Sequence, residues 1–360
     1  MNTFLNAIRN CLRGSFLVLA LIISIIATIL LDARDLRSPA NAKTDMPPAS
    51  VAPWHDPSWT PSATVPGLHT RQLDIGDLAG GGTTRVGVLE PTIPAVADVL
   101  FIHGHADRLD NHRALFTSLA QRGMRVISYD LPSHGKSHLA PIDRWSIDDL
   151  TELTARVEHA THTKHPLILS GWSFGGLIAT RIAQEPTRLH RFSRPIRALI
   201  LETPAVAPLS FVGGDGIAQA RTLTHDTDAP VAAPPTPASP FYNPLFATRL
   251  LTEATIAAAH PLPAGLPTLI IGSDPEHDRY IDAKKVATWA TGVAKKTGAN
   301  ITFRTCHGAR HGVDIEAWPT GPAANHHITN FIAKTLTLAT AATRTSNSTP
   351  TPTEVTTACR

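Results

Sequence analysis

Apolar and polar positions alternate in blocks through the middle of the chain. Short apolar runs fit strands that are buried on both faces, and helical stretches with an apolar face lie between them. The predicted strands are 99–102, 125–129, 167–169, 198–201, 268–271 and 301–304, and the predicted helices are 113–121, 147–161, 174–184, 281–294 and 324–338. Alternation of strand and helix predicts an α/β fold with a mostly parallel sheet and helices on both faces.

Two further patterns flank this core. Residues 71–76 and 84–90 resemble strands, and the turn at 79–82, Ala-Gly-Gly-Gly, predicts that they form a hairpin. Later, roughly 65 residues separate Leu201 from the strand at 268, which is far too long for a simple loop. This connection contains a helical stretch at 244–259, and we interpret about 205–264 as a cap over the active site.

The N-terminal segment has a different character. Residues 14–31 are apolar and carry no charge, a length just sufficient to cross a bilayer. Arg9 and Arg13 precede them, which favours a cytoplasmic N-terminus and export of the remainder. We therefore expect 1–37 to be a membrane anchor or an export signal, with the catalytic domain periplasmic or extracellular. An Ala-x-Ala pattern at 40–42 leaves open that the signal is cleaved after Ala42 and the protein is secreted.

Composition divides the rest into a domain and two flanking segments. Residues 38–65 are rich in Pro and Ala and predict a linker, 66–338 predict the folded domain, and the Thr-rich stretch 339–360 predicts a disordered tail. Cys11, Cys306 and Cys359 lie far apart without metal-type spacing, so neither a disulfide framework nor a zinc site is expected.

Chain length and net charge limit the classes of protein to which this chain can belong. A chain of 360 residues with 42% hydrophobic content can bury a large core, as a globular enzyme does. The net charge of +3 is small, and its basic residues are scattered, which argues against binding of nucleic acid. The sequence makes no prediction of oligomeric state.

The sequence Gly-Trp-Ser-Phe-Gly at 171–175 carries the first chemical indication. It follows an apolar run and opens a helical stretch, so it predicts a strand, a sharp turn and a helix. A serine on such a turn is held exposed in a strained conformation, and flanking glycines avoid collisions with the neighbouring elements. The pattern predicts Ser173 as a nucleophile.

A serine nucleophile needs a base, an acid and donors for the oxyanion. His311 follows the last predicted strand and is the predicted base, while the acid is predicted to be Asp278, with Asp274 as the alternative. The order Ser, Asp, His is the one used by enzymes with this kind of serine turn. The predicted oxyanion donors are the backbone N–H groups of His105 and Phe174, which follow a strand end and the nucleophile.

With these motifs the chain resembles the α/β-hydrolase superfamily, in the branch of monoacylglycerol lipases, lysophospholipases and serine aminopeptidase-like hydrolases. The resemblance spans about 98–338 and rests on residues 101–104, 129–137, 145–150, 171–176, 200–204 and 308–311. Two features depart from the family: the loop that bears the acid is longer, and Ser133 stands where a glycine is usual. The resemblance implies ester or amide hydrolysis through an acyl-enzyme, often on single-chain lipids, with no metal or organic cofactor.

The resulting hypothesis is a serine hydrolase of the carboxylesterase or lysophospholipase type (EC 3.1.1) that acts on a small-molecule or lipid ester, with monoacylglycerol or lysophospholipid as the first expectation. An aminopeptidase or amidase activity and a non-catalytic, membrane-tethered binding module are the alternatives. Two short motifs suggest other chemistries: residues 103–107 resemble part of a zinc hydrolase signature, and His105 with Asp110 has the spacing of an acyltransferase motif.

Overall fold

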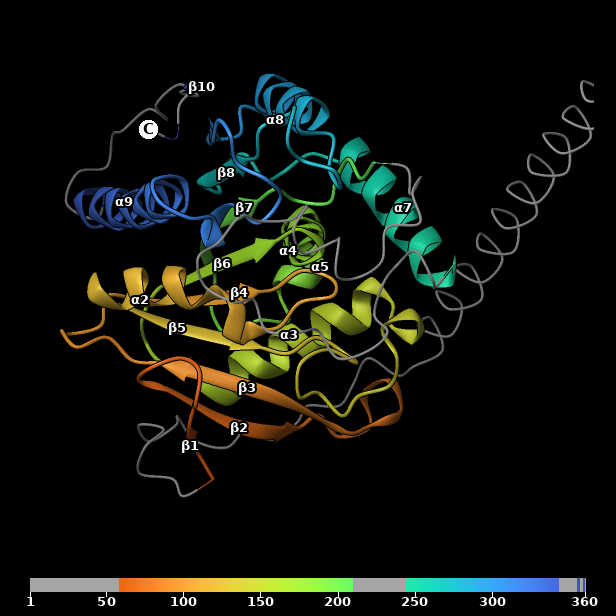
Figure 1. The fold of residues 1–360 in the computed structure, drawn as a ribbon, viewed down its shortest axis with the longest axis vertical. Coiled ribbons are helices and arrows are strands. Elements are labelled where there is room, and N and C mark those ends of the chain that lie inside the picture. Colours follow the sequence, from red (N-terminus) through yellow and green to blue (C-terminus); the bar gives the residue numbers. More distant parts are fainter. Residues whose placement is uncertain (1–57, 210–243, 343–354, 357–358, 360) are drawn as a thin grey trace, which may run out of the picture.

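The computed structural model describes residues 58–209, 244–342, 355–356 and 359 (Figure 1). The apolar segment 14–31, most of the predicted linker and residues 210–243 of the predicted cap lie outside these residues. Within the described part, no helix combines the length and the apolar character needed to span a bilayer.

A single sheet forms the centre of the domain. Among the described residues it has ten strands in the order β1-β2-β3-β5-β4-β6-β7-β8-β9-β10. The pairs β1–β2, β2–β3 and β3–β5 are antiparallel, and the other pairs are parallel. The strands are β1 Thr60–Pro61, β2 Leu68–Asp74, β3 Thr83–Leu89, β4 Ala97–Ile102, β5 Met124–Tyr129, β6 Leu167–Trp172, β7 Ile196–Glu202, β8 Thr268–Gly272, β9 Ile301–Thr305 and β10 Val355–Thr356. The predicted mostly parallel fold is confirmed.

Helices cover both faces of the sheet (Figure 1). The α-helices are α2 Arg113–Gln121, α3 Ile147–Thr161, α4 Phe174–Gln184, α5 Pro186–Leu189, α7 Pro244–Ala259, α8 Ala283–Thr297 and α9 Thr320–Ala342, and short 3-10 helices lie at η2 Leu78–Gly80, η3 Leu109–His112, η4 Ile142–Arg144 and η6 Val313–Ile315. One apolar cluster joins one sheet face to α3, α4, α7 and α8, and a second joins the other face to α2 and α9. Successive strand residues serve opposite clusters, as Leu100 and Phe101 do, because side chains alternate along a strand. Burial on both faces therefore explains the continuous apolar runs.

Local contacts explain where several elements begin. The predicted hairpin is present, and Gly82 in its turn has φ +120°, a conformation that favours glycine. Helix α8 begins at Ala283 rather than at 281, because Ile281 forms a β-bridge with Pro208. The side chain of Asp282 then accepts a hydrogen bond from the backbone N–H of Lys285 at 3.0 Å, as an N-cap residue does.

The structure differs from the sequence prediction at the start of the domain. Strand β1, inside the predicted linker, pairs with β2, and Val65 is fully buried. The ring of Trp59 packs against the core and lies 4.8 Å from the guanidinium carbon of Arg71. Folded structure thus begins before residue 66, because these few apolar side chains find partners that no periodic pattern announces.

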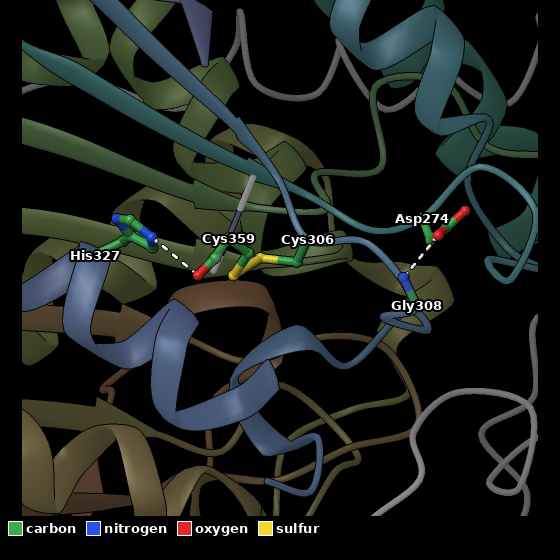
Figure 2. Close-up of a disulfide and its surroundings, with 5 residues drawn as sticks. All are labelled: Asp274, Cys306, Gly308, His327 and Cys359. Atoms are coloured by element: carbon green, nitrogen blue, oxygen red, sulfur yellow. Dashed lines mark hydrogen bonds between the residues drawn. A yellow bond between two sulfur atoms is a disulfide. The ribbon is translucent and has the colours of Figure 1, made fainter. Parts of the chain in front are cut away.

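The C-terminal segment also differs from the prediction. Helix α9 continues to Ala342, β10 pairs in parallel with the edge strand β9, and Cys359 forms a disulfide with Cys306 (Figure 2). The ring Nε2 of His327 donates a hydrogen bond to the carbonyl oxygen of Cys359 at 3.1 Å. The expectation of a disordered tail is therefore wrong for these residues, as is the expectation of no disulfide. The two cysteines are 53 positions apart, so only the return of the chain to β9 brings them together.

Candidate active site

The turn between β6 and α4 holds Ser173 in a strained conformation. Ser173 has φ +54° and ψ −117°, outside the regions that L-residues favour. A side chain at Gly171 would collide with the backbone of Gly175, and one at Gly175 would collide with the backbone of Ile102. The glycines therefore allow the close packing that pushes the serine out of the strand end.

His311 lies beside this serine, on the loop after β9. Its Nε2 is 2.7 Å from Ser173 Oγ, and its Nδ1 is 3.0 Å from Asp278 Oδ2. Because an ionised carboxylate only accepts, Nδ1 carries a proton and Nε2 is free to accept the serine hydroxyl proton. The His311 side chain is buried.

The structure separates the two candidate acids. Besides contacting His311, Asp278 accepts hydrogen bonds from the Ser273 hydroxyl and from the backbone N–H groups of Tyr280 and Ile281 at 2.8 and 2.9 Å. Burial alone would raise the pKa of Asp278, but the charge and hydrogen bond of His311 hold it below its ordinary value. The carboxyl is thus kept ionised beside the histidine.

Asp274 lies in the same loop but forms its hydrogen bonds with residues other than His311. It accepts hydrogen bonds from the backbone N–H of Gly308 at 2.6 Å and of Glu276 at 2.9 Å (Figure 2). The bond from Gly308 ties the loop after β8 to the loop that carries His311. Asp274 therefore shapes the site without touching the histidine.

The two predicted oxyanion donors belong to segments that meet at Ser173. A Cβ on Gly104 would lie 3.0 Å from Ser173 Cβ, so the loop after β4, which continues into His105, runs against the nucleophile. Phe174 is the first residue of α4, where backbone N–H groups lack partners within the helix. Both N–H groups are therefore in segments adjacent to the serine.

The chain is similar to several known proteins. The family model described as serine aminopeptidase, S33, matches residues 94–225. A protein of Mycobacterium phage D29 named as a non-heme haloperoxidase is 32% identical over 99 residues, 28% of this chain and 34% of the relative. A protein of Schizosaccharomyces pombe named as a monoglyceride lipase is 29% identical over 104 residues, 27% of each chain. The solved monoacylglycerol lipase of Paleococcus ferrophilus superposes with a TM-score of 0.52 at 16% identity, over 69% of this chain and 98% of that one.

The chain belongs to the α/β-hydrolase superfamily. Its similarity to monoacylglycerol lipases and to S33 serine aminopeptidases is of the partial kind described above. The matches span about a third or less of the length of the two curated relatives, and the structural likeness, at this identity, shows the fold alone.

Two neutral histidines support residues 103–107, which we call the oxyanion loop because they include the predicted donor His105. His134 Nε2 accepts a hydrogen bond from the N–H of Ala106 at 3.0 Å, and His103 Nε2 accepts one from the N–H of Leu131 at 2.9 Å. Their Nδ1 atoms donate to the carbonyl oxygens of Pro132 and Gly104, both at 2.7 Å. Burial lowers the pKa of each histidine to about 4, which keeps both rings neutral near pH 7.

The motif at residues 130–135 holds in place the segment that contacts the oxyanion loop. Asp130 pairs with Arg85 at 2.7 Å and accepts hydrogen bonds from the N–H groups of Leu109 and Lys136. Ser133, which replaces the usual glycine, has φ +59°, so a conformation suited to glycine is retained with a serine. The sequence identified this motif only through resemblance, and the role of His134 was not predicted.

Helix α7 lies over the oxyanion loop, as the predicted cap would. The ring of Phe246 stacks on His105 with centroids 4.2 Å apart and packs edge-on against Phe174 at 5.0 Å. Phe246 and Leu250 are buried, whereas Leu245 and Leu251 are exposed by 50% and 39%. Helix α7 thus places an aromatic ring against the side chains of both residues that carry the predicted oxyanion donors.

The residues of the two competing motifs are engaged elsewhere. Asp107 contacts His112, and His103 binds Gly104 and Leu131. Asp110 pairs with Arg85 at 2.6 Å rather than with His105. The zinc-like and acyltransferase-like patterns therefore do not assemble a common site.

Proposed function

We propose that this hydrolase is a serine esterase that cleaves carboxylic esters through an acyl-enzyme. The observation that carries the proposal is the chain of contacts from Ser173 Oγ through the His311 ring to Asp278, at 2.7 and 3.0 Å. A nucleophile in reach of a base, and a base in reach of an orienting carboxylate, are the elements of acyl transfer.

The first half of the reaction forms the acyl-enzyme. His311 Nε2 takes the hydroxyl proton as Ser173 Oγ attacks the ester carbonyl carbon, and the carbonyl electron pair moves onto oxygen. The N–H groups of His105 and Phe174 would stabilise that oxyanion, each donor contributing on the order of 10²-fold to the rate. His311 then gives the proton to the leaving alcohol oxygen as the bond from carbon to that oxygen breaks.

The second half releases the acid. A water molecule gives a proton to His311 Nε2 and attacks the acyl carbon, and collapse of the second tetrahedral intermediate returns the proton to Ser173 Oγ. Asp278 stays ionised throughout and stabilises the imidazolium that forms twice in each cycle. The lowered pKa of Asp278 supports this role.

The substrate class rests on the cap. The apolar side chains of Phe246 and Phe174 beside the oxyanion loop suit an acyl chain, and two of the similar proteins are named as monoglyceride or monoacylglycerol lipases. Monoacylglycerol or lysophospholipid is therefore the proposed substrate. Amide cleavage is the second candidate, favoured by the match to the serine aminopeptidase model, since the same triad serves both reactions.

We also propose an extracytoplasmic location for the domain, tethered through residues 14–31. The Cys306–Cys359 disulfide supports it, because such bonds persist mainly in oxidising compartments. Protease added to spheroplasts made from cells that express the full chain should digest the domain if it lies outside the inner membrane. Full protection in spheroplasts, with digestion after lysis, would contradict the location.

Hydrolysis assays test the proposed activity. Wild-type protein should hydrolyse p-nitrophenyl esters, and Ser173→Ala should lose about 10⁴-fold or more in kcat. Ser118→Ala on α2 is the matched control and should retain full activity. Comparison of monoacylglycerol, lysophospholipid and aminoacyl substrates then decides between ester and amide chemistry, and a preference for aminoacyl amides would favour the second candidate.

A further inference from the structure

A histidine outside the triad lies buried between two carboxylates. His112, at the end of η3, has Nε2 2.7 Å from Asp107 Oδ2 and Nδ1 2.6 Å from Asp314 Oδ2. His112 and Asp314 are fully buried, and Asp107 is nearly so. No local sequence pattern indicates this cluster, because His112 and Asp314 are 202 positions apart.

The geometry favours a charged ring. An ionised carboxylate only accepts hydrogen bonds, so two carboxylates at opposite ring nitrogens are both satisfied only when each nitrogen bears a proton. Burial alone would lower the pKa of His112, but the charges of Asp314 and Asp107 raise it well above its ordinary value. Burial would likewise raise the pKa of Asp107, yet His112 lowers it to about 2.

The two carboxylates belong to the two loops that the reaction uses. Asp107 is in the oxyanion loop, two residues after the predicted donor His105, and it also accepts a hydrogen bond from Asn111. Asp314 is in η6, three residues after His311, and its backbone carbonyl accepts a hydrogen bond from the Asn325 side chain at 3.1 Å. His112 therefore bridges the oxyanion loop and the His311 loop beneath the site.

Trp172 packs between this bridge and the base. Its ring centroid lies 5.4 Å from that of His112 and 5.2 Å from that of His311. On the other side, the ring of Phe101 lies 4.4 Å from His112. These aromatic rings enclose the imidazole of His112 within the core.

Glu202, the last residue of β7, completes the cluster. Both of its carboxyl oxygens are buried without a hydrogen-bond partner among the described residues, and burial followed by the charge of Asp314 raises the pKa of Glu202 well above its ordinary value. A protonated Glu202 leaves two negative charges and one positive charge in the cluster. A neutral His112 ring would leave the two anions uncompensated, which is costly in a buried site.

We propose that His112 is a positioning residue: its imidazolium, bonded to Asp107 and Asp314, holds the oxyanion loop and the His311 loop at their working separation. The inference rests on the proposed esterase function for its kinetic part. The charge state of the ring is measured independently of any activity.

The first test is nitrogen-15 NMR of the folded wild-type protein at about pH 8, above the ordinary histidine pKa of ~6.5. Two ring N–H signals are expected for His112, and both should be absent from His112→Gln. A single ring N–H at this pH would overturn the proposal. If wild-type protein had no esterase activity, this measurement would still decide the charge of the bridge.

The second test separates positioning from stability. His112→Gln loses the charge and one of the two bonds, and we expect kcat to fall about 10- to 100-fold with KM changed less than about twofold, as small misplacements of catalytic groups produce. Glu158→Gln is the control, because Glu158 is a fully buried carboxylate that pairs with Arg194 at 2.9 Å, at the end of α3. Compared at equal folded fractions, the same kcat in both variants would overturn the proposal.

Rescue of a cavity-forming variant by small molecules tests the hydrogen bonds directly. In His112→Ala, imidazole can enter the cavity and, once protonated, donate to both carboxylates, whereas thiazole has a similar shape and no N–H group. We expect imidazole to restore kcat and thiazole to leave it low. Equal rescue by both would show that the ring only fills space.

Discussion

The indole Nε1–H of Trp172 donates a hydrogen bond to the backbone carbonyl oxygen of His311 at 2.8 Å. The hydroxyl of Thr203 donates to the same carbonyl at 2.9 Å. Trp172 directly precedes the predicted nucleophile, so this bond fixes the base against the strand that carries the serine. The bond therefore links the strand of the predicted nucleophile to the loop of the predicted base without using the side chains of Ser173 or His311.

Trp172→Phe should therefore lower kcat more than it lowers binding. The variant keeps an aromatic ring but removes the hydrogen bond that the indole donates to the His311 carbonyl oxygen. Loss of that bond should lower the free energy of unfolding by about 1 kcal/mol. We expect kcat to fall about 10-fold with KM nearly unchanged. Trp289→Phe is the control, since the buried Trp289 indole has no hydrogen-bond partner among the described residues. Equal kcat values for the two variants would show that the bond does not position the base.

The two candidate acids should differ sharply when each is changed to asparagine. Asp278→Asn removes the charge that orients His311, and a loss of about 10⁴-fold in kcat is expected. Asp274→Asn keeps a side-chain oxygen for the N–H of Gly308 and should stay within about 10-fold of wild type. Ester hydrolysis by the two purified variants measures this difference, and near-wild-type rates in both would contradict the assignment of Asp278.

The neutral histidines under the oxyanion loop predict a loss of stability in acid. His103 and His134 have pKa values of about 4 in the folded protein, below the ~6.5 of an unfolded chain, so the unfolded state binds protons first as pH falls. Their contribution to the free energy of unfolding is complete above about pH 6.5. It declines as the pH falls from there to about 4.

Urea denaturation at a series of pH values measures this dependence. The free energy of unfolding should decrease across that window, and His134→Gln should show a smaller decrease, because glutamine does not titrate. If the free energy of unfolding of His134→Gln falls as steeply with decreasing pH as that of wild type, His134 does not contribute to the loss of stability in acid.

The disulfide should stabilise the folded chain with little effect on chemistry. Cys359→Ala removes the cross-link between β9 and the C-terminal segment, and a loss of about 2–4 kcal/mol in the free energy of unfolding is expected for a closed loop of this size. Peptide mapping without reductant should recover Cys306 joined to Cys359. Recovery of both as free thiols from oxidised protein would contradict the pairing.

Local sequence patterns were sufficient for most of the fold. The bounds of α2, α3, α4 and α7 agree with those expected from periodicity, because amphipathic spacing and turn residues are written into neighbouring positions. The Gly-x-Ser-x-Gly turn was likewise readable, since its steric needs involve adjacent residues.

Contacts between distant residues were not readable in the same way. Nothing near Cys306 announces Cys359, and nothing near His112 announces Asp314, since each pair meets only after the sheet has formed. Asp274 and Asp278 are aspartates in the same loop, so residue type alone does not tell which one is the acid. Only the course of that loop decides which one reaches His311.

Fluorophosphonate labelling of the folded protein, followed by peptide mass spectrometry, tests the central claim most directly. Covalent capture requires a serine activated by its base, so one adduct is expected on Ser173, absent from Ser173→Ala and strongly reduced in His311→Ala. Failure of the probe to label folded wild-type protein, or an adduct on another residue, would contradict the assignment of Ser173 as the nucleophile.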